Sequence, residues 1–393
     1  MESCSVDGED TFQLALLARG DQGYHETEVN FGIEADLHKH WIDCGKNPGH
    51  SNFIPVKEFN INNLPLEYRD EDILKYIKTQ SELTVRVVSS FTSSKRPPGY
   101  AFYNCRGRNF QRLGTGFVQY VYRNDTRTGK TCPCPECLSS QTPHVEWAKV
   151  KVRTATHVVF DDAEARNTVV ELFYDDDGDK GAVKRLYGDN VRFGALQGDW
   201  CDMRCVTHDV ELVDYLKDTW GMWRWLETKI NQKYSDQDHR LAVVVSHPHG
   251  CDKQVSVGAW KERNVVDRSR DFDNCVYTYD TPTCPGSSGA PVWILGKMKW
   301  AGFFGRHPHS GRPLNGLNRD EWGEKCSKSD TRVKSNKRVK SDTRVKSDTH
   351  DKSDTRVKSN NRVKSDTRVK SDAPVRSVTR FKSDTRVKPD THA

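Results

Sequence analysis

The 393-residue sequence lacks the features of a secreted or membrane-spanning protein. Its start, MESCSVDGED, has no basic stretch followed by an apolar core, so no signal peptide is expected. No run approaches the roughly 18 apolar residues that a membrane span needs. Twelve cysteines are spread over more than 300 residues, which is not a dense disulfide framework. We therefore expect a soluble, intracellular and cytoplasmic protein with mostly free thiols and no membrane span.

The C-terminal end differs in composition from the rest of the chain. Residues 327–393 contain twenty Lys or Arg and nine Asp, a net charge of +11, whereas the whole chain carries +6. The hexad SDTRVK recurs there, at 341–346, 353–358, 365–370 and 383–388. One valine in six residues cannot bury enough apolar surface to offset the entropy of ordering, so a disordered repeat tail is predicted. A basic arm for nucleic acid stays an alternative for this tail alone, and the interleaved Asp residues disfavour it.

Hydrophobic patterning divides the remaining chain into two parts. Residues 69–83 predict a helix with acidic residues in its first turn and apolar residues at helical spacing, and residues 208–229 predict another. Between and after them, short segments rich in β-branched and aromatic residues predict an antiparallel barrel or sandwich. We therefore expect a small N-terminal α/β segment of unknown role (1–83), an all-β core (84–326) and the tail (327–393).

The stretch TPTCPGSSGAPVW, residues 281–293, places two serines between glycines just before an apolar segment. Turn propensity explains each of these residue types, but it leaves their order to chance. An acyl-transfer nucleophile needs a hydroxyl at a tight turn and backbone N–H groups that converge on the oxyanion. With Ser288 as the nucleophile, the N–H groups of Gly286 and Ser288 can face one hollow, and Gly286 can adopt the required backbone angles.

A serine at neutral pH needs a base, and the base needs an orienting carboxylate. His157 ends the alternating strand VKVRTATH, whereas the rivals His208, His247 and His249 lie beside an acidic residue or in a Pro-Gly turn. Asp202 lies between short apolar residues in DWCDMRCV, which predicts a buried carboxylate. His157, Asp202 and Ser288 are therefore the candidate base, carboxylate and nucleophile.

The motifs GTGFV, TATHVV, CDMRCV and PGSSGAPV, in that order, resemble those of trypsin-like serine proteases with the chymotrypsin fold. The resemblance covers residues 84–309. It implies a double six-stranded antiparallel β-barrel, with His157 as general base, Asp202 as orienting carboxylate and Ser288 as nucleophile. It also implies an oxyanion hole formed by the N–H groups of Gly286 and Ser288.

Several residues differ from the family pattern, and they indicate which branch of the family and which cleavage preference to expect. Ser287 stands where digestive members carry an Asp that pairs with a cleaved N-terminus, so a non-zymogen branch is expected. Val158 replaces the cysteine that follows the catalytic histidine, so this branch should also be disulfide-poor. Pro282 stands where members that cut after Arg or Lys carry an Asp, so basic residues should not be preferred. Thr283 and Gly305, the latter within GFFGRH, are the other expected pocket residues.

A cysteine cluster suggests a metal. The stretch TCPCPECLSSQTPH contains Cys132, Cys134 and Cys137, and three thiolates with one more ligand can close a tetrahedral zinc site. The candidate fourth ligands are His144, Cys201 and Cys205. Free thiols in an exposed hairpin are the alternative. A site with four protein ligands leaves no position for water, so any zinc should be structural, and no cofactor is required for the chemistry.

These observations predict a serine endopeptidase that acts on polypeptides through a His-Asp-Ser triad and an acyl-enzyme. A zinc hydrolase is disfavoured because the sequence has no H-E-x-x-H motif. The alternative from another class is a catalytically silent, protease-like scaffold or binding protein.

Overall fold

The computed structural model describes most of the chain up to residue 327. The described residues are 8–32, 34–124, 126–176, 178, 180–235, 238–268, 272–297, 307–312, 316–320 and 325–327. Residues 328–393, which hold the predicted disordered repeat tail, lie outside them.

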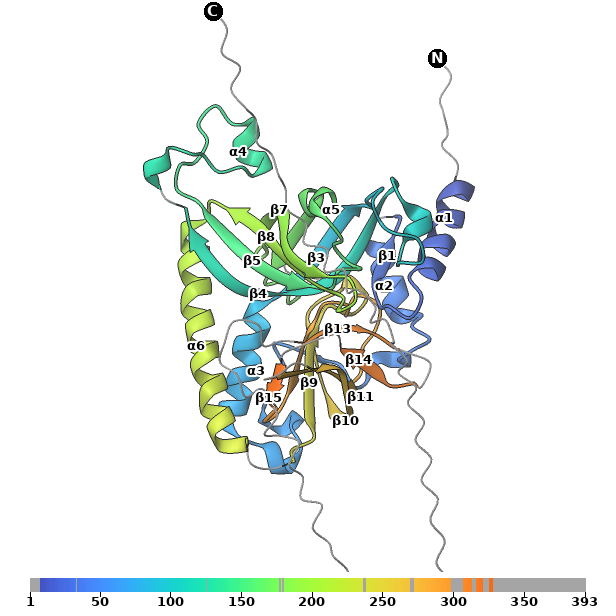
Figure 1. Cartoon of the computed structure of the whole chain (residues 1–393), viewed down its shortest axis with the longest axis vertical. Coiled ribbons are helices and arrows are strands. Elements are labelled where there is room, and N and C mark those ends of the chain that lie inside the picture. Colours follow the sequence, from blue (N-terminus) through green and yellow to red (C-terminus); the bar gives the residue numbers. More distant parts are fainter. Residues whose placement is uncertain are drawn as a thin grey trace, which may run out of the picture. The chain divides into compact units, whose positions relative to one another are not determined.

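Six antiparallel strands close into a first barrel (Figure 1) in the order β4-β3-β6-β7-β8-β5, with β5 returning to β4. The strands are β3 (Thr84–Phe91), β4 (Asn109–Arg123), β5 (Ala148–Thr154), β6 (Thr168–Leu172), β7 (Lys184–Ala195) and β8 (Trp200–Thr207). A short strand from the N-terminal segment, β1 (Glu28–Asn30), pairs with residues 111–113 of β4. The sequence pattern did not indicate β7, because its polar residues and glycines interrupt the alternation of apolar and polar side chains.

A second barrel closes in the order β11-β14-β13-β12-β9-β10, with β10 returning to β11. Its strands are β9 (Leu241–Ser246), β10 (Gln254–Arg268), β11 (Phe272–Tyr279), β12 (Pro291–Ile294), β13 (His307–Gly311) and β14 (Asn318–Asp320). Two short strands extend it, β2 (Ile54–Pro55) on β10 and β15 (Lys325–Ser327) on β11. The predicted double six-stranded barrel is therefore confirmed.

Helices lie outside the barrels. They are α1 (Gly8–Asp21), α2 (Ala35–Ile42), α3 (Glu71–Leu83), α4 (Pro135–Ser139), α5 (Asp162–Arg166) and α6 (Val210–Tyr234), with 3₁₀ turns η1 (Pro48–His50), η2 (Ile61–Asn63), η3 (Leu66–Tyr68), η4 (Tyr103–Cys105), η5 (Thr126–Thr128) and η6 (Pro248–Gly250). Both predicted helices are present as α3 and α6, each capped by an Asp side chain, Asp70 and Asp209. Figure 1 shows α6 running along the side of both barrels, and α3 packs against it.

One hydrophobic core joins these parts. Apolar residues of the first barrel, α3, α6 and β9 form a continuous buried cluster, in which the rings of Tyr76 and Trp293 lie 4.5 Å apart. A second cluster fills the other barrel. Residues 8–83 belong to the same compact unit as the barrels, because their strands β1 and β2 pair with one barrel each.

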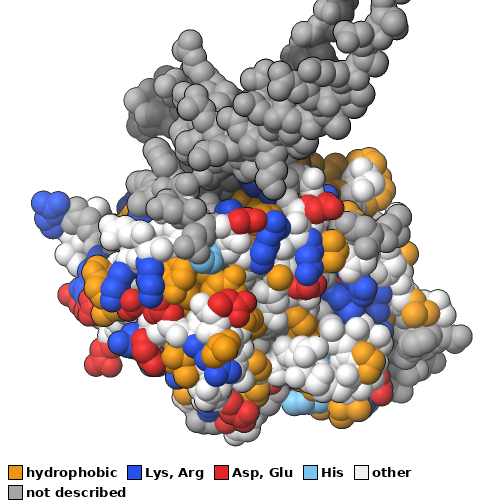
Figure 2. Space-filling view, turned by 90° about the horizontal axis from the view of Figure 1, so that it is seen from below, with side chains coloured by type: hydrophobic (Ala, Val, Ile, Leu, Met, Phe, Trp, Pro, Cys, Tyr) orange, Lys and Arg blue, Asp and Glu red, His pale blue; other side chains and the backbone are white. Residues whose placement is uncertain are grey.

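The surface has no segregation of side-chain types on the face shown in Figure 2, and the described cysteines form no disulfides. Figure 2 shows basic, acidic and apolar side chains interspersed on one face. The cysteines whose side chains are described are buried and form no disulfide, as predicted. Among the described helices, none combines the length and the apolar character that crossing a membrane requires.

Candidate active site

The two barrels present a serine and a histidine from neighbouring turns. Ser288 lies in the turn before β12, and His157 lies in the turn that follows β5. Thr115 N–H on β4 donates to the Ser288 carbonyl oxygen at 2.8 Å. A Cβ added at Gly114 would lie 2.9 Å from that oxygen and 2.9 Å from a methyl group of Val158, so glycine lets β4 pass this closely. The two turns therefore meet across β4.

The carboxylate that holds the histidine belongs to Asp199. Its Oδ2 accepts from His157 Nδ1 at 2.5 Å, and its Oδ1 accepts from the His157 backbone N–H at 2.9 Å. The Tyr100 hydroxyl donates to Oδ1 and the Ser310 hydroxyl donates to Oδ2, both at 2.9 Å. Burial alone would raise the pKa of Asp199, but the His157 and His25 imidazoles and these hydrogen bonds lower it below its ordinary value. Asp199 is therefore ionised at neutral pH.

The prediction that Asp202 holds this histidine is wrong. Asp202 lies on β8 opposite Arg153 on β5, and Arg153 Nε and Nη2 donate to its two carboxylate oxygens at 2.7 and 3.0 Å. Lys151 Nζ makes a third contact at 3.3 Å. Strand register fixes this pairing, because directly opposite residues of antiparallel strands are neighbours on one face. Asp202 is a buried structural ion pair, and Asp199, in the turn before β8, contacts His157 instead.

His157 is oriented so that one ring nitrogen is left for chemistry. Because ionised Asp199 can only accept, Nδ1 carries a hydrogen, and in the neutral ring Nε2 has the lone pair. Nε2 is buried and has no hydrogen-bond partner among the described residues. Arg96, itself paired with buried Glu164, donates to the His157 carbonyl oxygen at 3.0 Å and fixes the backbone. The ring of His25 stacks on that of His157, with centroids 4.0 Å apart.

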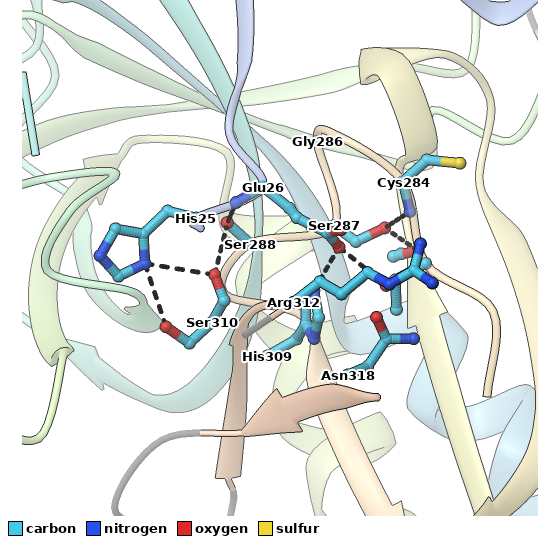
Figure 3. Close-up of polar contacts among 12 residues, drawn as sticks. His25, Glu26, Cys284, Gly286, Ser287, Ser288, His309, Ser310, Arg312 and Asn318 are labelled. Carbon is cyan, nitrogen blue, oxygen red and sulfur yellow. Dashed lines mark hydrogen bonds and ion pairs between the residues drawn. The ribbon is translucent and has the colours of Figure 1, made fainter. Parts of the chain in front are cut away.

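A peptide group from the N-terminal segment lies against Ser288 (Figure 3). The N–H groups of Gly286 and Ser288 donate to the Glu26 carbonyl oxygen at 2.7 and 3.3 Å. Glu26 N–H donates to Ser288 Oγ at 3.1 Å, and Ser288 Oγ donates to the Ser310 carbonyl oxygen at 3.3 Å. Gly286 has a φ of 95°, and a Cβ there would lie 2.4 Å from the His247 carbonyl oxygen. Glycine is therefore required where two N–H groups converge on one oxygen.

Two closed six-stranded barrels, with a serine, a histidine and a buried carboxylate at their junction, decide the architecture. The fold is that of the chymotrypsin-like serine proteases. The sequence matches no protein-family model and none of the curated proteins.

Several solved structures of serine-protease fold are similar to this chain. The active form of the Rv3671c protease from M. tuberculosis is 14% identical, over 64% of this chain and 82% of its own, with a TM-score of 0.34. Deg5 is 11% identical, over 66% of this chain and 91% of its own, with a TM-score of 0.32. The HtrA-type protease AlgW with a tripeptide is 9% identical, over 63% of this chain and 58% of its own, with a TM-score of 0.32.

The side chain of Glu26 is enclosed by polar and cationic groups. Thr283 Oγ1 donates to Glu26 Oε2 at 2.8 Å, and His309 Nε2 bonds to the same oxygen at 2.8 Å. Lys46 Nζ forms an ion pair with the other oxygen and donates to Thr283 Oγ1 at 2.9 Å. Burial alone would raise the pKa of Glu26, but Lys46 and His309 lower it to about 2. The pocket therefore binds an ionised carboxylate.

Residues 24–30 run across both barrels as an extended peptide. On one side, residues 24 and 25 pair with residues 311 and 312 through a 3.0 Å backbone hydrogen bond and an antiparallel bridge. On the other side, β1 pairs with residues 111–113 of β4. The peptide bond that follows Glu26 lies between the two pairings.

The expected pocket residues meet different outcomes. Thr283 contacts the Glu26 carboxylate, Pro282, its neighbour in the sequence, is half-buried, and Gly305 lies outside the described residues. The sequence pattern does not single out His309 on β13 or Lys46 in the turn after α2, because both reach the pocket from outside the motif that carries the serine. The one available signal for His309 is its position just beyond the GFFGRH stretch that was expected to shape the pocket.

The predicted cysteine cluster has a fourth member that the sequence did not indicate. Ligand atoms of Cys132, Cys134, Cys137 and His208 all lie within 4.8 Å of one another. His208 Nδ1 lies 3.4 Å from Cys134 Sγ and 3.5 Å from Cys137 Sγ. The three cysteines are buried, which contradicts the alternative of thiols in an exposed hairpin.

The candidate fourth ligands named from the sequence lie outside this cluster. The His144 side chain is exposed and stacks on His208 at 4.2 Å. Cys201 Sγ donates to the Val159 carbonyl oxygen at 3.2 Å, and Cys205 is buried in the barrel core. His208 is near in space because β8 ends beside the loop that carries the cysteines.

Proposed function

We propose that the protein is a serine endopeptidase that hydrolyses polypeptides with a triad of His157, Asp199 and Ser288. One observation carries the proposal: the Glu26 carbonyl oxygen accepts from the Gly286 and Ser288 N–H groups while the Glu26 N–H donates to Ser288 Oγ. A peptide bond held in this way exposes its carbonyl carbon to the serine hydroxyl, with two donors already at the oxygen.

The reaction follows from the partners of each side chain. In this proposal the Ser288 hydroxyl turns from the Ser310 carbonyl oxygen, its acceptor in the structure, toward His157 Nε2, and Oγ adds to the carbonyl carbon while its proton passes to that nitrogen. Asp199 stabilises the imidazolium, and the N–H groups of Gly286 and Ser288 stabilise the oxyanion. His157 then protonates the departing amine, and water hydrolyses the acyl-enzyme in a second, equivalent step that restores Ser288.

The Lys46 ammonium group in the pocket supports the expectation that Arg and Lys are not preferred at the residue before the cleaved bond. A basic side chain there would lie beside Lys46, and like charges in a buried site repel. The second candidate function, a catalytically silent scaffold, is disfavoured by the two N–H donors of Gly286 and Ser288 that converge on one carbonyl oxygen beside the Ser288 hydroxyl.

A fluorophosphonate probe tests the nucleophile. Because residue 26 covers Ser288, the probe is applied to the full chain and to the full chain with Glu26→Lys, which loosens the covering segment by placing two cations in one pocket. We expect an adduct on Ser288, located by peptide mass spectrometry, and none after Ser288→Ala. Ser287→Ala is the matched control and should still label, because Ser287 Oγ bonds to Ser246 and the Cys284 N–H. A folded Glu26→Lys chain without an adduct would support the scaffold.

We also propose that Cys132, Cys134, Cys137 and His208 bind one structural zinc ion. Ligands about 2.0–2.3 Å from a tetrahedral centre lie about 3.3–3.8 Å apart, and the contacts of His208 with two of the thiols are 3.4 and 3.5 Å. Four protein ligands leave no open position, so the ion would stabilise the loop and not take part in hydrolysis. Elemental analysis should find one zinc fewer per chain after Cys134→Ser, and an unchanged zinc content would contradict the site.

A further inference from the structure

Residues 24–30, here called the covering segment, lie across Ser288 as a polypeptide substrate would, although they belong to the same chain. The peptide bond between Glu26 and Thr27 lies between the pairing with β13 at His25 and the pairing with β4 that begins at Glu28. Its carbonyl oxygen lies between the two N–H donors, at 2.7 and 3.3 Å. Thr27 is 1% exposed, and its N–H donates to Gln22 Oε1 at 3.0 Å. The bond is therefore held at the nucleophile by groups on both sides.

The pocket beneath this bond fits glutamate. Lys46 pairs with one carboxylate oxygen, while Thr283 and His309 bond to the other. Because the Glu26 carboxylate can only accept, His309 Nε2 carries a hydrogen, and Nδ1 of the neutral ring accepts from the Tyr279 hydroxyl at 2.6 Å. A glutamine would lose the ion pair with Lys46, and an apolar side chain would remove the acceptor that Thr283 Oγ1 and His309 Nε2 share.

We propose that the chain cleaves its own bond between Glu26 and Thr27, and that the same pocket makes glutamate the preferred residue before the cut in other polypeptides. The proposal rests on the proposed endopeptidase function. Ser288 Oγ forms an ester with the Glu26 carbonyl carbon, the C–N bond breaks, and the Thr27 amine takes the proton that His157 received. Water then hydrolyses the ester, which leaves a Glu26 carboxylate and restores the Ser288 hydroxyl.

Cleavage would clear the cleft. Until the bond is cut, residues 24–26 occupy the edge of β13 and the acid pocket, which another polypeptide would need. This differs from zymogen activation, in which the new N-terminus pairs with an Asp that precedes the nucleophile. Ser287 stands at that position here, so the new N-terminus at Thr27 has no such role. The N-terminal segment instead blocks the site until it is released.

Intact-mass analysis and N-terminal sequencing of the full chain test the cut. The wild-type chain should convert to a product that begins at Thr27, at a rate independent of protein concentration, because the reaction is intramolecular. Ser288→Ala should stay intact. Glu26→Gln should slow the conversion at least about tenfold. Glu67→Gln, at an exposed glutamate, is the matched control and should convert like the wild type.

The fluorophosphonate adduct separates the two ways in which this can fail. If Glu26→Lys labels at Ser288 but the wild-type chain keeps residues 1–26, the endopeptidase function stands and self-cleavage is overturned. If neither labelling nor cleavage occurs, both proposals are overturned. Cleavage of Ser288→Ala at the same bond would assign the cut to another protease. A peptide library cut by the processed chain without enrichment of glutamate would overturn the specificity.

An independent observation concerns a second group of metal-ligating side chains. Cys44, His50, His249 and Cys284 are all buried, and their ligand atoms lie within 4.8 Å of one another. Cys284 Sγ lies 3.6 Å from Cys44 Sγ and 3.4 Å from His50 Nε2. The two sulfur atoms are too far apart for a disulfide bond of about 2.05 Å. The spacings match the edges of a tetrahedral zinc site, about 3.3–3.8 Å.

Surrounding groups prepare these side chains as ligands. His249 Nδ1 bonds to Glu28 Oε2 at 2.9 Å, and its buried Nε2 has no hydrogen-bond partner within the described part of the chain. Asn47 donates to both sulfur atoms, through its backbone N–H to Cys44 at 3.4 Å and through Nδ2 to Cys284 at 3.1 Å. A carboxylate behind a histidine orients the ring for a metal, and N–H groups aimed at sulfur stabilise a thiolate.

We infer that these four residues bind a second structural zinc ion. Two of them come from the turn after α2, which also carries Lys46, and Cys284 precedes the turn that presents Ser288. The ion would tie the N-terminal segment to the nucleophile turn and hold Lys46 at the acid pocket. It would have four protein ligands and no open position for water.

Metal content tests this site in the full chain with Ser288→Ala, which keeps the N-terminal segment attached. Elemental analysis and native mass spectrometry should find two zinc ions per chain, one after Cys44→Ser and one after Cys134→Ser. Cys105→Ser, a buried cysteine outside both clusters, should keep two. A parent chain with a single zinc that Cys134→Ser removes entirely would overturn the second site even if Cys44→Ser does not fold. A disulfide between Cys44 and Cys284 in peptide maps would also overturn it.

Discussion

Two of the buried pairs of histidine and carboxylate, His157–Asp199 and His309–Glu26, differ in what the second nitrogen of the ring contacts. In one pair, His157 Nδ1 bonds to Asp199, and Nε2 has no hydrogen-bond partner among the described residues. In the other pair, His309 Nε2 bonds to Glu26 at 2.8 Å, and Nδ1 accepts from the Tyr279 hydroxyl at 2.6 Å. The first ring can receive a proton, whereas the second has both nitrogens engaged.

This difference separates catalysis from recognition at the proposed site. Burial lowers the pKa of His309, although Glu26 opposes the shift, so the ring is neutral at neutral pH and acts as a fixed donor. Asp199 belongs to the chain permanently, whereas the carboxylate at His309 belongs to the residue before the cut. A histidine–carboxylate pair can thus transfer a proton or recognise a side chain, depending on whether the second ring nitrogen is free or hydrogen-bonded.

Removing the charge of Asp199 is the largest test of the catalytic pair. Asp199→Asn should lower kcat about 10³- to 10⁴-fold, because an amide cannot stabilise the imidazolium and can favour the wrong tautomer. Asp202→Asn is the matched control: kcat should change little, while Tm falls because Arg153 loses its buried partner. Both variants are compared by steady-state kinetics and thermal unfolding. An equal loss of kcat in the two would contradict the assignment of Asp199.

The contrast between these aspartates shows what the sequence could predict. Ser288 and His157 are recognisable because a glycine turn and a strand end carry their own local patterns. Asp199 has no such pattern, since its position depends on Tyr100 and Ser310, which are distant in the sequence. The basic residues that alternate along β5 were the available signal that Asp202 is taken by an ion pair.

The barrels were predictable because alternation and turn residues report strands directly. The covering segment was not, because residues 24–30 have no strong strand pattern and are extended only through pairing with β4 and β13. Lys46 and His50 likewise gain their roles from contacts with the turn before Ser288. Long-range contacts of this kind leave no periodic signature in the sequence.

Removing the donor at the recognition pair should alter selectivity and leave catalysis intact. His309→Phe keeps a ring in the buried space but removes the hydrogen bond to the carboxylate. We expect kcat/KM for peptides with glutamate before the cut to fall about 100-fold. The value for matched leucine peptides, the internal control, should change less than about threefold. An equal fall for both peptides would mean that His309 supports the fold or the triad and not recognition.

Acid pH should weaken the preference for glutamate by a calculable amount. The pKa of bound Glu26 is about 2, against an ordinary value of 4.5, so the stabilisation is complete above pH 4.5 and is lost as the pH falls toward 2. The ratio of kcat/KM for glutamate and glutamine peptides should therefore drop about fourfold at pH 4 and about thirtyfold at pH 3. Using the ratio cancels every pH effect that the two peptides share, including any unfolding of the chain. A ratio that stays constant down to pH 3 would contradict recognition of the charged form.

The smallest expected effect comes from the group behind the recognition histidine. Tyr279→Phe removes the hydroxyl that donates to His309 Nδ1, so the ring can turn its hydrogen away from the carboxylate. We expect kcat/KM for glutamate peptides to fall about five- to tenfold, which corresponds to one hydrogen bond of about 1 kcal/mol, with kcat unchanged. Tyr277→Phe, on the same strand and equally buried, is the matched control and should keep the wild-type ratio. If both variants lose selectivity equally, packing of β11 and not the tautomer of His309 sets the preference.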